Sequence, residues 1–251
     1  MNNDIKNAIA EAAKNTGLSH QAVFDQAVKI LNIEILGRLD SPENAQFTSR
    51  VCHVPFFDMD RTMSHETFME FDIVARYMIK AFNESAPFED VIGQYYEDEF
   101  LKERQPEEWF ITPERVTEFV GKVKRDIKKT PVHATFVDAG CRTGLQTLSF
   151  LKQIFHACGK NKMYNRLVGI SDPNPALLRI AICQVMVNCL RHDMRIGSLI
   201  AYNYDLLADF DDAENHKVFV VSAMTGAARK AAQKASEKAI LANNYKTQKA
   251  A

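Results

Sequence analysis

Apolar residues recur at helical spacing through most of the first 130 residues of the chain. A stripe that returns every three or four positions is typical of an amphipathic helix. One stripe follows Ser19, and another follows Ser64, a residue type that caps helix N-termini. The stripes consist of Val23, Phe24, Ala27, Val28, Leu31 and Ile35, and of Phe68, Phe71, Val74, Met78 and Phe82. We therefore predict an all-helical N-terminal domain over residues 1–130.

Two further segments of this part, residues 88–103 and 112–127, also have helical patterns. We expect the second helix to start with Thr112 as N-cap and Pro113 as first helical residue, because the hydroxyl satisfies an orphan amide and proline presets the backbone. Residues 38–63 have no clear period and contain turn residues. They predict a long connection, with room for a short element inside it.

After Pro131 short apolar runs alternate with helical patterns. The runs "VHATFVD", "RLVGIS", "IGSLIAYNY" and "KVFVVS" predict strands, and "LQTLSFLKQIFHAC" and "NPALLRIAICQVMVNCL" predict helices. Strand and helix in alternation are typical of an open, mainly parallel sheet covered on both faces. We expect an α/β, doubly wound domain over residues 131–226, followed by a basic Ala/Lys-rich helix and tail over residues 227–251.

Composition and charge narrow the function classes. The 251 residues have a net charge of −1 and a pI near 6.7, so no overall charge draws the chain to nucleic acid or to a membrane. A run of about 18 apolar residues is missing, as is a signal-peptide pattern, which predicts a cytoplasmic protein without a membrane partner. The five cysteines form no C-x-x-C pair, and we expect free thiols and no metal site.

The stretch "FVDAGCRTGLQTLSF" predicts the end of a buried strand, a tight turn and a helix start. In a doubly wound sheet, ligands bind beyond the carboxyl ends of the strands, where backbone amides and helix N-termini converge. Asp138, Gly140, Cys141 and Gly144 fall at such a place. A glycine at this corner also serves positive φ or close packing alone, so the turn by itself leaves both interpretations open.

The next two strands end in aspartates as well. Asp172 stands before a helix, where an acidic side chain in this architecture accepts hydrogen bonds from ribose hydroxyls, and Asp205 follows the third strand. We expect the three strand ends to bring Asp138, Asp172 and Asp205 to one edge of the sheet.

These segments resemble the motifs of a known family. "FVDAGCRTG", "VGISDPNPALLRIA" and "YDLL" are similar to the first three motifs of S-adenosylmethionine-dependent, adenine-specific DNA methyltransferases. "FEDVIGQYYEDEFLKERQPEEWFITPERVTEFV" resembles a segment of type I restriction-modification M subunits, D-x-x-G-x-x-Y-E followed by F-T-P-x-x-V. The resemblance covers about residues 88–207, and an ordered set of motifs is more specific than one motif.

The resemblance implies S-adenosylmethionine as cofactor, and DNA and restriction-modification specificity subunits as partners. Asp138 and Gly140 would border its methionine and sugar, Asp172 the ribose, and Asp205 the adenine, while residues 110–113 would cover the methionine end. The cofactor-binding residues that it implies are Phe110, Thr112, Pro113, Asp138, Gly140, Cys141, Gly144, Asp172 and Asp205.

Two departures from the family keep the function open. Arg142 replaces a glycine of the turn, and "VFVVS" is followed by "AMTGA" where the family has N/D-P-P-Y/F. Ser222 is the one candidate there for an acceptor of the target amine. The sequence therefore leaves DNA adenine methylation beside two alternatives. One is a catalytically inactive, shortened homologue that binds cofactor or a partner protein, and the other is a small-molecule methyltransferase.

Overall fold

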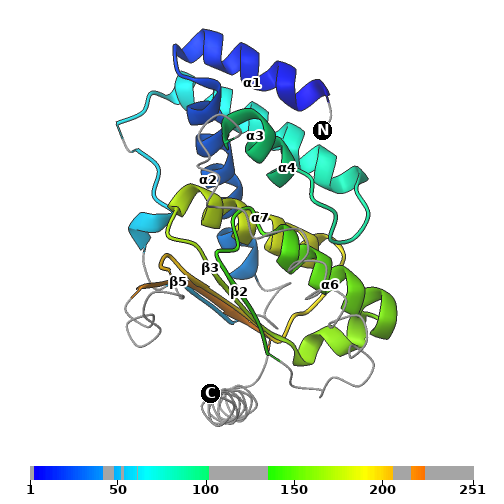
Figure 1. Ribbon diagram of the computed structural model, residues 1–251. Helices are drawn as coiled ribbons and strands as arrows, with labels where there is room; N and C mark the ends of the chain where they lie inside the picture. Colours follow the sequence, from blue (N-terminus) through cyan, green and yellow to red (C-terminus); the bar gives the residue numbers. More distant parts are fainter. Residues whose placement is uncertain are drawn as a thin grey trace, which may run out of the picture.

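The computed structural model describes residues 3–41, 48–51, 54–60, 62–101, 135–205 and 216–223. Figure 1 shows three levels within these ranges: the N-terminal helices at the top, helix α7 beneath them, and the sheet at the bottom. The protein is thus a mixed α/β protein in which helices precede most of the sheet.

The N-terminal helices follow the predicted stripes. Helix α1 spans Asn3–Thr16, α2 spans His20–Leu39 and α3 spans His65–Glu84. The side chains of Ser19 and Ser64 each accept a hydrogen bond from the backbone amide three residues later, which confirms the predicted start of α3 and satisfies an orphan donor in both helices.

The predicted helix over residues 88–103 is wrong for residues 88–92. Phe88 has a φ of 58°, and regular structure begins only with α4, Gly93–Tyr96, which continues as a π-helix, η3, Glu97–Leu101. The backbone amides of Phe88, Val91 and Ile92 donate to side chains of a distant helix. These long-range bonds replace the helical ones, so local periodicity is a poor guide here.

Five strands form one sheet in the order β1-β5-β4-β3-β2. They are β1 (Thr48–Val51), β2 (Thr135–Ala139), β3 (Leu167–Ser171), β4 (Ser198–Tyr202) and β5 (Lys217–Ser222). Strands β2, β3 and β4 are parallel and follow chain order, with β2 at one edge of the described sheet. Strand β5 is antiparallel to β4, and β1 is antiparallel to β5.

The sheet therefore corrects two predictions. It is mixed rather than mainly parallel, because the chain leaves β4 and enters β5 at the same edge, where the amide of Asn203 donates to the carbonyl of His216 at 2.9 Å. An apolar run such as β5 has the same pattern in either direction. The N-terminal part is also not all-helical, since β1 lies within the unpatterned connection of residues 38–63. Four residues are too few to show a period.

The two helices between the parallel strands match the predicted limits closely. Helix α6 spans Leu145–Cys158, and α7 spans Pro175–Arg191 with Asn174 as its N-cap. A short 3-10 helix, η5 (Lys160–Asn165), follows α6, and another, η2 (Val54–Phe56), follows β1.

Helix α7 joins the helical layer to the sheet. It contacts α2, α3, α4 and α6 and lies over the strands, so both parts share one continuous hydrophobic core (Figure 1). The predicted boundary near residue 130 and the predicted tail over residues 227–251 lie outside the described residues. Within the described ranges, each helix is too short or too polar to cross a membrane.

Candidate functional site

The turn after β2 has three residues in the left-handed region. The φ angles are 72° for Gly140, 52° for Arg142 and 93° for Gly144. The amide of Cys141 donates to the carbonyl of Ser171 at 2.8 Å, which attaches the turn to the end of β3. Left-handed backbone costs a non-glycine residue about 1–2 kcal/mol, so Arg142 holds a strained conformation that the family's glycine would avoid.

Asp172 ties the ends of the parallel strands together. Its carboxylate accepts the backbone amide of Arg142 at 2.9 Å and that of Asn174 at 2.8 Å, while the side-chain amide of Asn203 donates to its backbone carbonyl at 2.9 Å. Burial raises the pKa of Asp172, and these backbone donors oppose the rise. The carboxylate thus organises the edge before any ligand is considered.

The structure brings the three predicted aspartates to this same edge. Asp138 is buried, and its carboxylate accepts the hydroxyl of Thr147 at 2.7 Å. Burial raises the pKa of Asp138, with a further rise from the charge of Asp172, whose own pKa is in turn raised slightly by Asp205. The three groups are therefore close enough to act on one another electrostatically.

The other residues of the turn divide into open and packed positions. Among the described residues, a Cβ on Gly140 would meet no atom within 4 Å, whereas a Cβ on Gly144 would lie 3.1 Å from Ala181 of α7. Gly144 thus permits close packing, and no described atom covers the Cβ position of Gly140. Burial raises the pKa of the Cys141 thiol well above its ordinary value. This shift disfavours the thiolate, which is the nucleophilic form of cysteine.

Glu97 of η3 contacts the turn from the helical layer. Its Oε1 accepts the hydroxyl of Thr143 at 3.0 Å and lies 3.3 Å from Nε of Arg142. The strained arginine is therefore oriented by a carboxylate that lies far from it in the sequence. Neither Glu97 nor Thr143 was among the site residues that the sequence predicted.

Two buried side-chain amides of α7 hold the segment before α4 and the turn after β2 in place. Oε1 of Gln184 accepts the backbone amide of Val91 at 2.9 Å, and its Nε2 donates to the carbonyl of Thr143 at 3.0 Å. Oδ1 of Asn188 accepts the amide of Phe88 at 2.6 Å. Two amides four residues apart in the otherwise apolar segment "IAICQVMVNCL" are the signal that would have identified them.

Gly93 lets this segment approach the turn. A Cβ there would lie 2.6 Å from Nε2 of Gln184, 2.7 Å from Oδ1 of Asp90 and 2.7 Å from Oγ1 of Thr143. Cβ contacts under 3.0 Å essentially do not occur. A larger residue would therefore displace these three side chains at the position where the resemblance places the G of D-x-x-G-x-x-Y-E.

Tyr96 connects the segment to a partly buried acid on α2. Its hydroxyl accepts Nε2 of Gln21 at 2.9 Å and is hydrogen-bonded to Asp25. Burial raises the pKa of Asp25 from 3.8 to about 6, although the cations of Arg179 and Lys29 oppose the rise.

Ser222 lies at the end of the sheet where β4 begins, opposite the end that holds the three aspartates. It pairs with Ser198, the first residue of β4, and its hydroxyl donates to the carbonyl of Gly197 at 2.8 Å. The structure therefore places Ser222 away from the three aspartates, because β5 runs antiparallel to β4.

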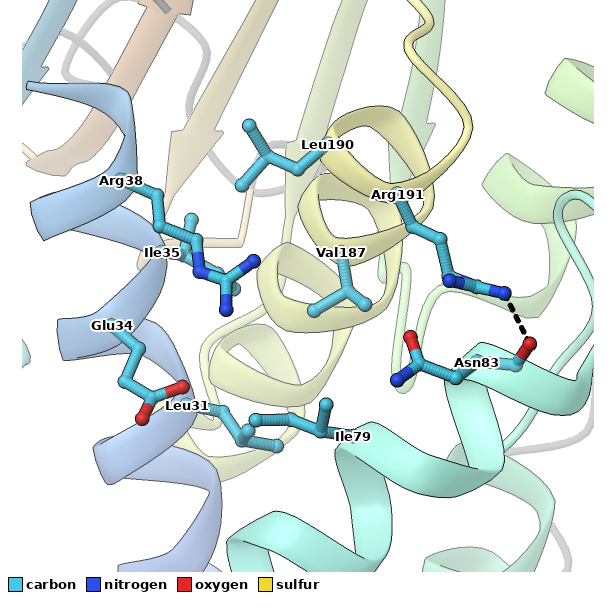
Figure 2. A pocket seen from close by; sticks show the side chains of 9 residues that line it. All are labelled: Leu31, Glu34, Ile35, Arg38, Ile79, Asn83, Val187, Leu190 and Arg191. Atoms are coloured by element: carbon cyan, nitrogen blue, oxygen red, sulfur yellow. Dashed lines mark hydrogen bonds between the residues drawn. The ribbon is translucent and has the colours of Figure 1, made fainter. Parts of the chain in front are cut away.

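A separate cavity of about 300 Å³ lies between α2, α3 and α7 (Figure 2). Figure 2 shows Leu31 and Val187 in its apolar lining, with Glu34, Arg38 and Arg191 around them. Arg191 donates to the backbone carbonyl of Asn83. The cavity contains none of the predicted site residues.

The predicted lid residues Phe110, Thr112 and Pro113 lie outside the described residues. Among the residues that are described, no group of His, Cys, Asp and Glu side chains has the arrangement of a metal site. Comparisons of the chain with protein-family models, with curated proteins and with solved structures found no match.

Proposed function

We propose that this chain binds S-adenosylmethionine at the carboxyl edge of β2, β3 and β4, as a relative of the adenine-specific DNA methyltransferases that its motifs resemble. The run from β2 through α6, β3 and α7 to β4 supports a Rossmann-like arrangement, since helices between parallel strands bring the strand ends to one edge.

One observation carries the proposal: the two stretches with the most family-like motifs lie against each other. Residues 90–97 contact the turn of residues 138–144 through Glu97 with Arg142 and Thr143, and through the close approach of Gly93. Each of the two stretches resembles the methyltransferase motifs independently of the other. Their contact supports one functional unit, because unrelated matches have no reason to meet around one turn.

The residues at this edge fit the cofactor. The open side of Gly140 leaves room for a ligand against the backbone. Each carboxylate oxygen of Asp172 accepts one backbone amide and keeps a second acceptor position for a ribose hydroxyl. In this proposal Asp138 borders the methionine and sugar, Asp205 lies beside the adenine, and residues 110–113 cover the methionine end.

S-adenosylmethionine supplies an electrophilic methyl group on a sulfonium centre. Transfer to adenine requires groups that orient the flipped base and its amine. Ser222, the candidate for that role, is bonded to Gly197 at the far edge. This position favours the second candidate function, in which the chain binds cofactor or a partner protein, such as a specificity subunit, without methylating DNA by itself.

Two glycines with matching geometry provide the test. Gly140 and Gly17 both have a φ of 72°, and a Cβ on either would meet no atom of the described residues within 4 Å. Gly140→Ala and Gly17→Ala should therefore lose similar stability, about 1 kcal/mol. We expect only Gly140→Ala to weaken binding of S-adenosylmethionine, by about tenfold or more, in calorimetric titration. Equal affinity in the two variants would remove the turn from the binding site.

A further inference from the structure

A second cavity opens beside the same edge of the sheet, on the side of β4 and β5. It has a volume of about 350 Å³. We call it the basic pocket; the residues that define it here are Phe56, Pro175, Arg179, Asn203, His216 and Lys217. None of these residues is among the predicted cofactor ligands.

Basic side chains dominate the described lining of the basic pocket. Arg179 comes from α7, and His216 and Lys217 lie at the start of β5. None of the described residues that line the pocket is acidic. Cations around a concave, partly apolar surface raise the local concentration of anions, so the lining favours a negatively charged ligand.

Arg179 is held in one orientation at the wall. Its guanidinium carbon lies 5.2 Å from the centre of the Phe56 ring, and its Nη1 donates to the Phe56 carbonyl at 3.2 Å. Burial lowers the pKa of Arg179, while Asp25 opposes this effect. A partly desolvated guanidinium with its plane fixed is suited to bind two oxygens of a phosphate or carboxylate.

Asn203 is also held in place before a ligand arrives. The side-chain amide of Asn203 donates to the carbonyls of Asp172 and Pro173, at 2.9 and 3.0 Å. Its backbone amide donates to the carbonyl of His216 at 2.9 Å. A preformed wall reduces the entropic cost of binding.

We propose that the basic pocket binds the phosphate group of a nucleotide, either free or within a nucleic acid strand. Cavities of about 300–1,000 Å³ hold small organic ligands, so the pocket has room for a sugar or base beyond the phosphate. Phosphate rather than carboxylate suits three basic residues, because a phosphate monoester carries up to two charges and more acceptor oxygens.

The test uses thymidine 5′-monophosphate, which shares neither adenine nor methionine with S-adenosylmethionine. Titrations of the full chain would compare it with thymidine, with inorganic phosphate and with single-stranded oligothymidylate. Lys217→Gln and Arg179→Gln each remove one cation of the pocket. Lys152→Gln is the matched control, because it removes a lysine of α6 that pairs only at the surface with Glu89 at 3.7 Å.

We expect thymidine 5′-monophosphate to bind at least about tenfold more tightly than thymidine, and each pocket variant to lose about tenfold in affinity. The control should bind like the unaltered chain. Tighter binding of oligothymidylate with a steep salt dependence would assign the phosphate to nucleic acid, and tighter binding of the mononucleotide would assign it to a free nucleotide. Equal binding of thymidine and its monophosphate, or equal affinity of Lys217→Gln and Lys152→Gln, would overturn the proposal.

Discussion

The carboxylate of Asp172 accepts the backbone amide of Arg142 at 2.9 Å, although Arg142 has a φ of 52°. The bond joins the turn after β2 to the end of β3, and it holds a bulky residue in a conformation that glycine adopts more easily. The bond thus helps to hold the left-handed conformation of Arg142, at a position where the family that the motifs resemble has glycine.

Replacing Arg142 separates the backbone strain from the ion pair with Glu97. We expect Arg142→Gly to be more stable than Arg142→Ala by about 1 kcal/mol, because both lose the side chain and only glycine relieves the positive φ. Denaturant unfolding of the two variants measures the difference. If the alanine variant is as stable as the glycine variant, the turn is not strained.

Gly93→Ala should destabilise the protein by about 1–3 kcal/mol. The new Cβ would displace side-chain atoms of Gln184, Asp90 and Thr143 that are held in hydrogen bonds. Gly37→Ala is the control, since Gly37 also lies in a helix but has no atom of the described residues within 4 Å of its Cβ position.

The control should gain about 0.5–1 kcal/mol from better helix propensity. Thermal unfolding of both variants gives the comparison. A loss of stability in Gly37→Ala equal to that in Gly93→Ala would contradict the role of Gly93 in close packing.

Local sequence signals were sufficient to predict some elements of the fold and not others. The limits of α6 and α7 follow from local signals, such as the Asn174 cap and the apolar periodicity. The segment at residues 88–92 does not, because Gln184 and Asn188 satisfy its amides from a distant helix. A single sequence carries no local sign of such pairing.

The candidate site divides in the same way. Strand-end positions placed Asp138, Asp172 and Asp205 at one edge, since that follows from parallel order alone. The contacts of Glu97 depend on tertiary packing, and the location of Ser222 depends on the direction of β5. The alternation of apolar and polar residues along a strand predicts neither the packing nor the direction.

Asp25 should give the protein a stability that falls with rising pH. Its folded pKa of about 6 lies above the ordinary 3.8, so the folded state holds the proton more tightly than the unfolded state. The stabilisation is complete below about pH 4 and is lost as pH rises to about 6.

We therefore expect the stability of Asp25→Asn relative to the unaltered chain to increase by about 2 kcal/mol as the pH rises from 4 to 6. Comparing the two proteins at each pH cancels the other titrating groups. Parallel stability curves across this range would show that Asp25 titrates normally.

The chain alone should not methylate duplex DNA at an appreciable rate, and Ser222→Ala should not change that result. Misplacement of reacting groups by about 1 Å can cost two orders of magnitude in rate, and Ser222 lies at the far edge. Tritium transfer from labelled S-adenosylmethionine to mixed-sequence DNA is the assay. Incorporation that disappears in Ser222→Ala would show that Ser222 takes part in methyl transfer. It would also contradict the candidate function in which the chain does not methylate DNA.

Calorimetric titration of the unaltered chain with S-adenosylmethionine and its demethylated product tests the central claim most directly. We expect saturable binding of one molecule per chain, with both ligands competing for the same site. The absence of saturable binding up to about 1 mM, a Kd that corresponds to only about −4 kcal/mol, would contradict it.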